Sequence, residues 1–482
     1  MVIKRPTQLL TLVVATIVLF PWLIAGQVAP ALIQPAYLQL GSEFVTGAMA
    51  VVWHSGPAAS GAQAEWRPAG SSDWRPASSQ ACEPLPDRDV CTAQLAVGAS
   101  GTPFDYRVRL RDEVLSSGRG RAPSASNQPS RFVVFGDFGD GSAAQWDLAR
   151  RVSELHRATA FDFGLIAGDL AYECGTRLEF TRNFFPILNP PSDDALMRSL
   201  PFAAAVGNHD VGDLRWPLPP FRCSSDYSFF SFLRHPRGLG VTPIGPRHKP
   251  KTPSNGVPAG STTAALLGQA NYSFAWGLAH VTVLDSNRYV DWSHASAQRW
   301  LADTLSAGQA YPWRFVLLHH PPFNLTSDHR DDQWIRYLVP MFERQRVTAV
   351  FSGHVHNFQW FGPVHFTPEP SDVRRYEDGS RGRFAGRLEV QDNYDGVTST
   401  HARWPIYIVT GAGGGGSLIR GSRSGGCPPN VTTVQGCGPL ASIEGRTPSL
   451  TVVEVAPASV ILRQVASSGG TVLLRRIDKM PE

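Results

Sequence analysis

Short runs of alternating apolar and polar residues fill the chain between residues 30 and 125. A period of two residues predicts strands that bury one face. Clusters of Gly, Pro and Ser separate the runs at the spacing typical of a β-sandwich. The runs are Tyr37–Leu40, Ala48–Trp53, Ala64–Arg67, Thr92–Leu95 and Phe104–Leu110. The segment holds no group suited to catalysis, so we expect a supporting all-β domain over residues 30–125 and a linker at Pro123–Ser130.

The pattern changes at Arg131, after which apolar runs of strand length alternate with helical patterns. This alternation is typical of a layered α/β domain, which we expect over residues 131–482. The expected strands are Arg131–Phe135, Phe161–Ala167, Phe202–Val206, His280–Leu284, Arg314–Leu318, Thr348–Ser352 and Ile406–Thr410. The expected helices are Ser142–His156, Ala295–Leu305 and Asp331–Gln345. A closing antiparallel ribbon is expected at Leu450–Val455, Val460–Gln464 and Thr471–Arg475.

Two long stretches of this domain follow neither period, and they are His235–Thr263 and Gly362–Arg403. Loops of that length inside a compact domain are usually functional or disordered. We therefore expect two irregular loops, and we expect them to form the walls of any site.

The N-terminus carries the pattern of an export segment. Lys4 and Arg5 precede an apolar run from Leu9 to Ile24. A basic start followed by such a run predicts a signal peptide over residues 1–26. The run is almost long enough to span a bilayer, so an uncleaved N-terminal anchor is the alternative. In either case the body of the protein lies outside the cytoplasm, as a secreted or periplasmic protein.

The chain has six cysteines, an even number that predicts disulfides in an exported protein. Their spacing alone does not give the connectivity. Pairing of Cys82 with Cys91, and of Cys427 with Cys437, would close short loops and leave Cys174 and Cys223. The C-x-x-C spacing of zinc sites is absent from the sequence.

Charge excludes one class of partner. The net charge is +4 over 482 residues, and the basic residues form no run. A protein that binds nucleic acid usually carries a basic stripe or patch. We therefore expect no nucleic acid partner.

Each of five expected strands is followed at once by a side chain that can bind a metal ion. The segments are Gly136-Asp137-Phe138-Gly139, Gly168-Asp169-Leu170-Ala171-Tyr172, Gly207-Asn208-His209-Asp210, His319-His320 and Gly353-His354-Val355-His356. One such segment is weak evidence, because Asp and Asn are also common in turns and helix caps. Sites in open α/β sheets form at the carboxyl ends of the strands. Five such ends in one domain therefore predict a convergent site.

This order of segments resembles the purple acid phosphatases, a family within the calcineurin-like metallophosphoesterases. The family pattern is D-x-G, G-D-x-x-Y, G-N-H-D/E, V-x-x-H and G-H-x-H, and Val316-Leu317-Leu318-His319 supplies the fourth block. The β-domain and the closing ribbon are similar to those of the larger, plant-type members. The resemblance implies a layered α/β metallophosphoesterase domain, its β-sheets flanked by helices, preceded by a fibronectin-III-like sandwich.

The resemblance also implies two sets of metal ligands. By position, Asp137, Asp169, Tyr172 and His356 would hold a ferric ion. Asp169, Asn208, His319 and His354 would hold a divalent ion, with Asp169 bridging the metals. Carboxylates and a phenolate suit a trivalent ion, whereas imidazoles and an amide suit zinc, manganese or ferrous iron. Tyr172 is the distinguishing ligand, because tyrosinate bound to ferric iron gives the resembling family its purple colour.

Three further residues are expected beside the substrate. In the resembling family the histidine at the position of His209 stabilises charge or protonates the leaving oxygen. We expect Asp210 to orient His209. His329 matches a second substrate-side histidine of the family, although Phe323–Asp328 departs from the family's sequence pattern there. His320, beside a ligand, is expected to be a residue of the wall.

The expected mechanism needs no covalent intermediate. Two metals about 3.5–4 Å apart would bind the phosphate oxygens and acidify a water to hydroxide, which would attack phosphorus in line. The run Gly411–Gly416 lacks the Lys-Ser/Thr ending of a phosphate-binding loop, so we expect a tight loop near the site.

The sequence thus predicts an acid phosphatase that hydrolyses small-molecule phosphate monoesters with Fe(III) and a second metal (Zn, Mn or Fe(II)). A phosphodiesterase or nucleotide pyrophosphatase with the same metals is the alternative, because the walls of the site, and not the ligands, separate these activities. A binding protein that kept the scaffold and lost catalysis is a second alternative. It would require a missing ligand, and all seven are present.

Overall fold

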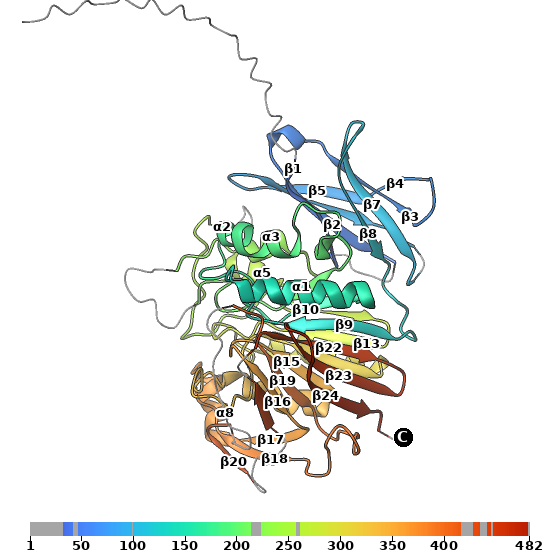
Figure 1. Cartoon of the computed structure of the whole chain (residues 1–482). Helices are drawn as coiled ribbons and strands as arrows, with labels where there is room; N and C mark the ends of the chain where they lie inside the picture. The colour runs from blue at the N-terminus through green and yellow to red at the C-terminus, as the bar shows by residue number, and fades with distance from the viewer. Residues whose placement is uncertain are drawn as a thin grey trace, which may run out of the picture.

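The computed structural model describes residues 32–41, 47–98, 100–213, 223–256, 261–415, 428–433, 441–444 and 447–480. The expected signal peptide or anchor at residues 1–26 lies outside these ranges, as do Cys427 and Cys437. Within them, the search for a helix of sufficient length and apolar character to cross a bilayer finds none. Figure 1 shows a small all-β unit above a larger layered unit.

The N-terminal unit consists of two antiparallel four-stranded sheets. One has the order β1-β2-β6-β5, formed by Leu32–Gln39, Met49–Ser55, Asp89–Leu95 and Ser79–Pro84. The other has the order β4-β3-β7-β8, formed by Arg75–Pro76, Gln63–Pro68, Pro103–Leu110 and Glu113–Arg121. Trp53 of the first sheet shares a buried core with Trp66 and Tyr106 of the second. The two sheets therefore face each other as a sandwich, with the 3₁₀ helix η1 (Pro57–Ala59) between β2 and β3.

The larger unit is built on two central sheets. The six-stranded sheet has the order β11-β10-β9-β22-β23-β24, formed by Phe202–Ala204, Phe163–Ile166, Ser130–Phe135, Ser449–Val455, Ser459–Ala466 and Thr471–Asp478. β9, β10 and β11 are parallel, whereas β22 pairs antiparallel with β9, β23 with β22, and β24 with β23. The expected closing ribbon is therefore part of the main sheet, and its first strand lies next to β9.

The seven-stranded sheet has the order β12-β13-β14-β15-β19-β16-β21. Its strands are Tyr272–Trp276, Ala279–Val283, Trp313–Leu317, Ala349–Ser352, Ile406–Thr410, Phe358–Phe361 and Ala441–Glu444. β13, β14, β15 and β19 are parallel, and β12, β16 and β21 pair antiparallel at the two sides. A third sheet joins β17 (Val364–Pro368), β18 (Gly386–Val390) and β20 (Val431–Thr433).

Helices cover the sheets and fill the connections. The α-helices are α1 (Ala143–Ala158), α2 (Arg177–Glu179), α3 (Phe185–Leu188), α4 (Ser228–Phe232), α5 (Thr263–Gly268), α6 (Ala295–Ala307), α7 (Val339–Arg344) and α8 (Pro370–Glu377). The other helical turns are η2 (Phe180–Phe184), η3 (Leu196–Arg198), η4 (Gly308–Ala310) and η5 (Trp334–Leu338). α1 begins at Ser142, whose side chain accepts a hydrogen bond from the Gln145 backbone N–H as an N-cap.

The alternation along β9 explains the layering. Phe132 and Val134 point into the core between the two large sheets, where the Phe132 ring lies 5.4 Å from that of Phe315. Val133 and Phe135 point to the other face, in the core that contains Leu148 of α1. A strand buried on both faces reads as an unbroken apolar run, which is why the sequence pattern located it.

Two expectations are corrected by the fold. The stretch Gly362–Arg403 is not irregular, because β17, α8 and β18 lie within it and β17 pairs with β18. The helix expected at Asp331–Gln345 starts later, with η5 at Trp334 followed by α7. A turn at residues 328–331 precedes η5 instead, and it brings Asp332 to the site described next.

Candidate metal centre

Five strands end at one edge of the larger unit, and each leads to an expected metal ligand. β9, β10 and β11 of the six-stranded sheet lead to Asp137, to Asp169 with Tyr172, and to Asn208. β14 and β15 of the seven-stranded sheet lead to His319, and to His354 with His356. The parallel strands of both sheets have their carboxyl ends at this edge, to which the β9 arrow points in Figure 1.

The phenol of Tyr172 lies in the middle of one half of the site. Its Oη is 3.3 Å from Asp137 Oδ1, 3.1 Å from Asp169 Oδ2 and 3.0 Å from His356 Nε2. His356 Nε2 is also 3.4 Å from Asp137 Oδ1. The four residues expected to bind the ferric ion therefore present their donor atoms to one another.

The other half of the site is centred on His319. His319 Nε2 lies 2.9 Å from Asn208 Oδ1 and 3.4 Å from Asp169 Oδ2. The opposite ring nitrogen, Nδ1, lies 2.8 Å from the Ala167 carbonyl oxygen. A carbonyl only accepts, so Nδ1 carries a hydrogen and Nε2 is the nitrogen that would bind a metal ion. Asp169 contacts both halves, as a bridging ligand must.

The backbone around the ligands is unusual. Asp137, Asp169 and His354 have φ of 57°, 55° and 67°, in the left-handed region that residues other than Gly seldom adopt. Such conformations cluster at functional sites, where the surrounding structure enforces them. Close packing adds to this, since a Cβ at Gly207 would lie 2.0 Å from Asp169 Oδ1 and one at Gly353 would lie 2.4 Å from Asp137 Oδ2.

Asp210 has a different role from the one expected. Its carboxylate accepts the backbone N–H groups of Asp169, Leu170 and Gly207 at 3.0, 2.9 and 2.8 Å. These bonds tie the loop after β10 to the loop after β11. The expectation that Asp210 orients His209 is therefore corrected: Asp210 holds the backbone of two ligand-bearing loops.

His209 is oriented by a backbone carbonyl. Its Nδ1 lies 2.6 Å from the Glu173 oxygen, and its ring centre lies 4.4 Å from that of Tyr172. Its Nε2 is 4.0 Å from Asp169 Oδ2, so this nitrogen faces the site. The next residue, Cys174, forms a disulfide with Cys223, which fixes the turn that bears the carbonyl.

A group of rings extends from His319 toward the surface. The His354 ring lies 5.0 Å from that of His319, 4.3 Å from that of His320 and 3.9 Å from that of His329. His320 is buried and its Nδ1 contacts Ser286 Oγ at 3.0 Å, so it belongs to the wall as expected. His329 is the more exposed ring, with 39% of its side chain accessible.

Sequence reasoning missed Asp332, which contacts two of these rings. Its Oδ2 lies 3.0 Å from His354 Nε2 and 3.4 Å from His329 Nδ1. The one signal available was the spacing of His329 and Asp332, three residues apart, which is too common to single out a site.

The glycine-rich run packs against the backbone of the loop that carries Asp137. In its described part, the Gly413 N–H bonds to the Gly136 carbonyl at 3.0 Å, and the Gly415 N–H bonds to the Asp137 carbonyl at 2.6 Å. These two hydrogen bonds agree with the expected tight loop, and they support the backbone of Asp137.

The buried charges at the site balance one another. Burial lowers the pKa of His319, but the Asp169 carboxylate more than offsets this and raises it to about 9. Burial would raise the pKa of Asp169, but His319 and His209 hold it well below its usual value. Burial, together with Asp169 and Asp137, raises the pKa of Tyr172 well above its usual value. Only a strong positive charge beside Tyr172 would convert it to phenolate.

The donor set fits metal ions. Asp137, Asp169 and His319 offer ligand atoms that lie within 4.8 Å of one another, and all three side chains are buried. Buried carboxylates require compensating positive charge, and bound cations supply it. The Tyr172 side carries the hard oxygens, while the His319 side carries nitrogen and amide oxygen. The residues present therefore suit two different metals.

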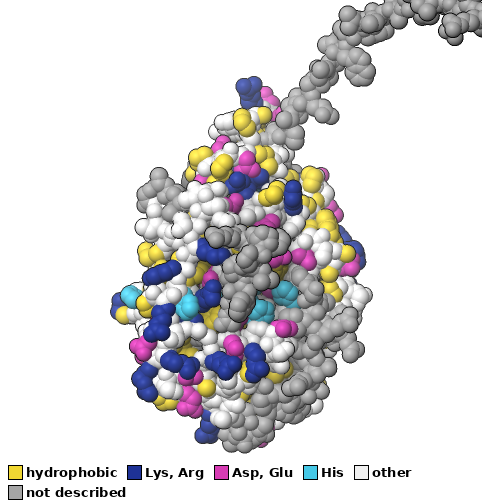
Figure 2. Space-filling model, turned by 90° about the vertical axis from the view of Figure 1, so that its left-hand side faces the viewer, with side chains coloured by type: hydrophobic (Ala, Val, Ile, Leu, Met, Phe, Trp, Pro, Cys, Tyr) yellow, Lys and Arg dark blue, Asp and Glu magenta, His cyan; other side chains and the backbone are white. Residues whose placement is uncertain are grey.

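The face of the molecule at this edge is basic. Figure 2 views the side to which β9 runs, and it shows cyan histidine side chains above a band of dark-blue Lys and Arg side chains. Arg375 on α8 and Arg383 after it each have more than half of the side chain exposed, and they pair with Asp372 and Asp331. A basic surround attracts anionic ligands.

Comparisons with known proteins give a family match and several partial relatives. The family model for the calcineurin-like phosphoesterases matches residues 130–358. Purple acid phosphatase 22 of Arabidopsis thaliana is 25% identical over 318 residues, covering 59% of this chain and 64% of the relative. Purple acid phosphatase 18 of the same plant is 31% identical over 160 residues, covering 28% and 35%. The chain thus spans less than two thirds of the length of these relatives.

Solved structures confirm the expected fold class. The purple acid phosphatase PPD1 from yellow lupin (Lupinus luteus) seeds superposes with a TM-score of 0.60 at 15% identity, covering 92% of this chain and 74% of that one. A structure of PhoD gives a TM-score of 0.55 at 13% identity, covering 93% and 91%. Residues 130–358 therefore match the calcineurin-like phosphoesterase family, and the chain that contains them is similar in sequence to purple acid phosphatases and in fold to the lupin enzyme.

Proposed function

We propose that this protein is an acid phosphatase, which hydrolyses phosphate monoesters to an alcohol and inorganic phosphate at a two-metal centre. One observation carries the proposal: Tyr172 Oη lies within 3.3 Å of donor atoms from Asp137, Asp169 and His356. The phenol oxygen is buried among two carboxylates and an imidazole, where a phenylalanine would offer no atom that can bind a metal ion. It serves well as a ligand for a trivalent ion.

The residues divide between two metals. Asp137, Asp169, Tyr172 and His356 would hold Fe(III), and Asp169, Asn208, His319 and His354 would hold a divalent ion such as Zn, Mn or Fe(II). Bound there, the pair would neutralise the phosphate charge and acidify a water molecule. The basic face around the site would draw in the anionic ester.

His209 supplies the proton for the leaving alcohol in this proposal. Because Nδ1 is held by the Glu173 carbonyl, Nε2 is the nitrogen that faces substrate. A hydrogen on Nε2 would be donated to the oxygen that leaves phosphorus. His329, exposed beside His354, lies where a second imidazole would contact the ester.

Export is part of the proposal. The Cys82–Cys91 and Cys174–Cys223 disulfides support an oxidising compartment. Small phosphate esters are the proposed substrates.

The test compares a chromogenic phosphate monoester with its diester, from acid to neutral pH, on metal-loaded protein. We expect faster monoester hydrolysis and an acid optimum. A His319→Ala variant should abolish turnover, while His365→Ala, which removes a histidine paired with Glu343 on the surface, should not. Faster diester hydrolysis would instead assign the site to a phosphodiesterase, and unchanged turnover in the His319 variant would refute the ligand assignment.

A further inference from the structure

One buried carboxylate outside the ligand set touches the site. Asp332 is 5% exposed, and its Oδ2 lies between His354 Nε2 at 3.0 Å and His329 Nδ1 at 3.4 Å. The turn that presents it closes with a hydrogen bond from the Asp332 N–H to the His329 carbonyl at 3.0 Å. The backbone of His329 is in the left-handed region at φ 53°. The ring of the expected metal ligand His354 and the ring of the expected substrate-side residue His329 thus contact the same oxygen, Asp332 Oδ2.

The contact determines which nitrogen of His354 can bind a metal. An ionised carboxylate only accepts, so the hydrogen of the His354 ring is on Nε2 and the lone pair is on Nδ1. His319 is held the opposite way, since its Nδ1–H bonds to the Ala167 carbonyl. The two imidazoles of the divalent site are therefore fixed as opposite tautomers by two different acceptors. A carboxylate behind a ligating imidazole orients the ring and strengthens it as a donor.

The neighbours of Asp332 hold it firmly. Trp334 Nε1 donates to the Ser286 carbonyl at 2.9 Å, and the Trp334 ring lies 4.9 Å from that of His320. The buried Arg336 guanidinium donates to the carbonyls of Pro322 and Phe384 at 2.7 and 2.8 Å. These bonds attach the segment after Asp332 to the wall of the site on one side and to the chain that follows α8 on the other.

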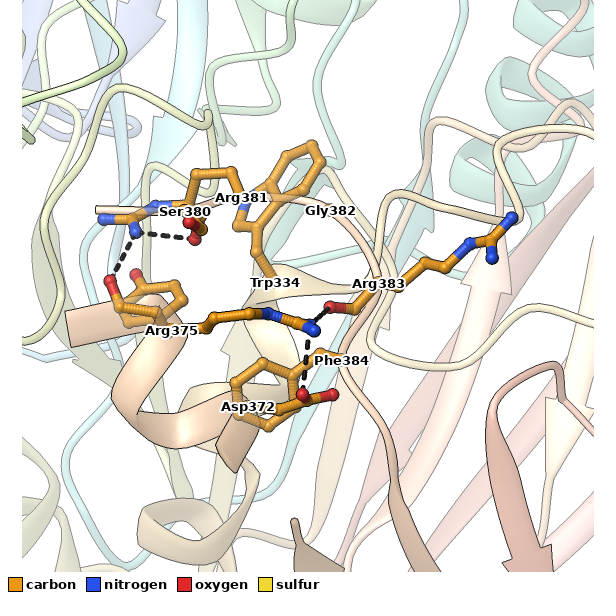
Figure 3. A pocket seen from close by; sticks show the side chains of 9 residues that line it. Trp334, Asp372, Arg375, Ser380, Arg381, Gly382, Arg383 and Phe384 are labelled. Atoms are coloured by element: carbon orange, nitrogen blue, oxygen red, sulfur yellow. Dashed lines mark hydrogen bonds and ion pairs between the residues drawn. The ribbon is translucent and has the colours of Figure 1, made fainter. Parts of the chain in front are cut away.

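Asp331, the adjacent carboxylate, faces the other way. Its Oδ1 accepts from Arg383 Nε at 2.8 Å. Figure 3 shows the surroundings, with Trp334 and Arg383 among the side chains that line a pocket of about 220 Å³. Two aspartates adjacent in sequence therefore have opposite surroundings, and Asp331 offers a matched control.

We propose that Asp332 is a positioning residue of this site. Its Oδ2 fixes His354 with Nδ1 toward the divalent metal and at the same time holds the His329 ring toward substrate. The role has two halves. The substrate half, which is the positioning of His329, rests on the proposed function. The metal half, which is the positioning of His354, rests on the ligand geometry alone.

The first test measures metal binding without turnover. Iron-loaded protein is titrated with Zn²⁺ against a chromogenic chelator, for the wild type, Asp332→Asn and Asp331→Asn. We expect Asp332→Asn to bind zinc about 10–100-fold more weakly, the usual effect of removing such a partner. Asp331→Asn should bind as the wild type does, and both variants should keep their iron. Equal zinc affinity in Asp332→Asn and the wild type would overturn the proposal.

The second test isolates the substrate half. At saturating Zn²⁺, Asp332→Asn should recover its kcat but keep a raised KM for a phosphate monoester. In a His329→Ala background, adding Asp332→Asn should leave KM unchanged, because the ring that it positions is gone. Independent effects of the two substitutions on KM would refute this half. If the wild type shows no phosphatase turnover, the proposed function is refuted. The zinc titration would still test whether Asp332 positions His354 for metal binding.

A measurement on the unaltered protein covers the case in which Asp332→Asn fails to fold. Nitrogen-15 NMR of the histidine rings reports which nitrogen carries hydrogen. With zinc bound, we expect His354 to carry it on Nε2 and His319 to carry it on Nδ1. Hydrogen on Nδ1 of His354 would contradict the proposal.

Discussion

At the scale of single residues, Tyr172 is the side chain whose chemistry is most tightly specified by its neighbours. Its ring packs on His209, and its oxygen meets two carboxylates and an imidazole. The ring contact accounts for an aromatic residue at this position. Only the oxygen contacts require that residue to be tyrosine, so the ring and the hydroxyl can be tested apart.

Replacing Tyr172 with Phe keeps the ring and removes the oxygen. We expect iron-loaded Tyr172→Phe to lose the visible tyrosinate-to-iron absorption band, with little change in the unfolding temperature of the metal-free protein. Absorption spectra of the two proteins make the comparison. Tyr407→Phe is the control, since Tyr407 is buried and its hydroxyl has no hydrogen-bond partner among the described residues. A band that survives in Tyr172→Phe would show that another group is the chromophore.

His235 is a buried histidine that makes the stability of the fold depend on pH. Its ring stacks on Tyr272 with the centroids 4.5 Å apart, and neither ring nitrogen has a hydrogen-bond partner among the described residues. Burial first, and then the nearby Arg234, lowers its pKa from 6.5 to about 3. The unfolded chain therefore binds a proton between these values while the folded protein does not. Stability must fall as pH drops below about 6.5, by up to about 1.4 kcal/mol per pH unit from this residue.

A His235→Phe variant keeps the stacked ring and removes this titration. Between pH 7 and pH 4.5, we expect the variant to lose about 2–3 kcal/mol less of its unfolding free energy than the wild type. Denaturant unfolding at the two pH values measures the difference. His401→Phe, at an exposed position, should behave as the wild type does. Equal losses in His235→Phe and the wild type would mean that His235 is protonated in the folded state.

At the scale of elements, the loops after β10 and β11 act as one unit because Asp210 ties them together. Burial first, and then the Asp169 charge, raises the pKa of Asp210 to about 7. Its carboxylate must accept three N–H groups, which an amide cannot do.

In Asp210→Asn, the side-chain NH₂ group meets backbone N–H groups and leaves at least one of them without an acceptor. We expect a loss of about 1–3 kcal/mol in unfolding free energy, together with weaker retention of both metals. Calorimetry and metal analysis measure these two effects. Asp303→Asn, on the exposed face of α6, should change neither. Normal metal content in Asp210→Asn would show that the loops hold their geometry without this tie.

The elements also show what sequence can reveal. Strands such as β9 and β14 were predictable because burial on both faces makes residues 132–135 and 315–317 unbroken apolar runs. β5 and β8 were missed, since Ser79–Pro84 and Glu113–Arg121 are largely exposed and polar and depend on their neighbours for pairing. α8 was missed for a similar reason, with only Asp372 and Tyr376 buried along its length.

The candidate site divides in the same way. The seven expected ligand residues could be brought together from the sequence because each lies just after a strand and needs only local sequence to place it. Asp332 was not, since its contact with His354 spans 22 residues and depends on a turn where a helix was expected. Glu173 contacts His209 through its backbone carbonyl, and a pattern of side chains does not predict a backbone contact.

At the scale of the whole molecule, the sandwich and the larger unit are joined by buried polar contacts. Tyr37 Oη of β1 donates to the Phe232 carbonyl at 2.7 Å, at the end of α4, and it lies 3.0 Å from His54 Nε2. Tyr106 Oη of β7 donates to the Arg198 carbonyl at 3.0 Å. Contacts of this kind couple the two units in unfolding.

Tyr37→Phe removes one of these contacts and leaves a buried carbonyl without its donor. We expect a loss of about 1–3 kcal/mol in unfolding free energy, with both units still melting in one transition. Calorimetry combined with near-ultraviolet circular dichroism follows the two units together. Tyr311→Phe, at a partly exposed position, should have no such effect. A separate early melt of the sandwich in the wild type would show that the units are independent.

The position of β22 has a consequence for how the protein is made. β9, which leads to Asp137, lies between β10 and β22, so its second neighbour comes from residues 449–455. More than 300 residues are synthesised between β9 and that neighbour. The edge of β9 therefore stays open until residues 449–455 have been made. A metal ion at Asp137 would be held in the closed sheet only from that point in synthesis onward.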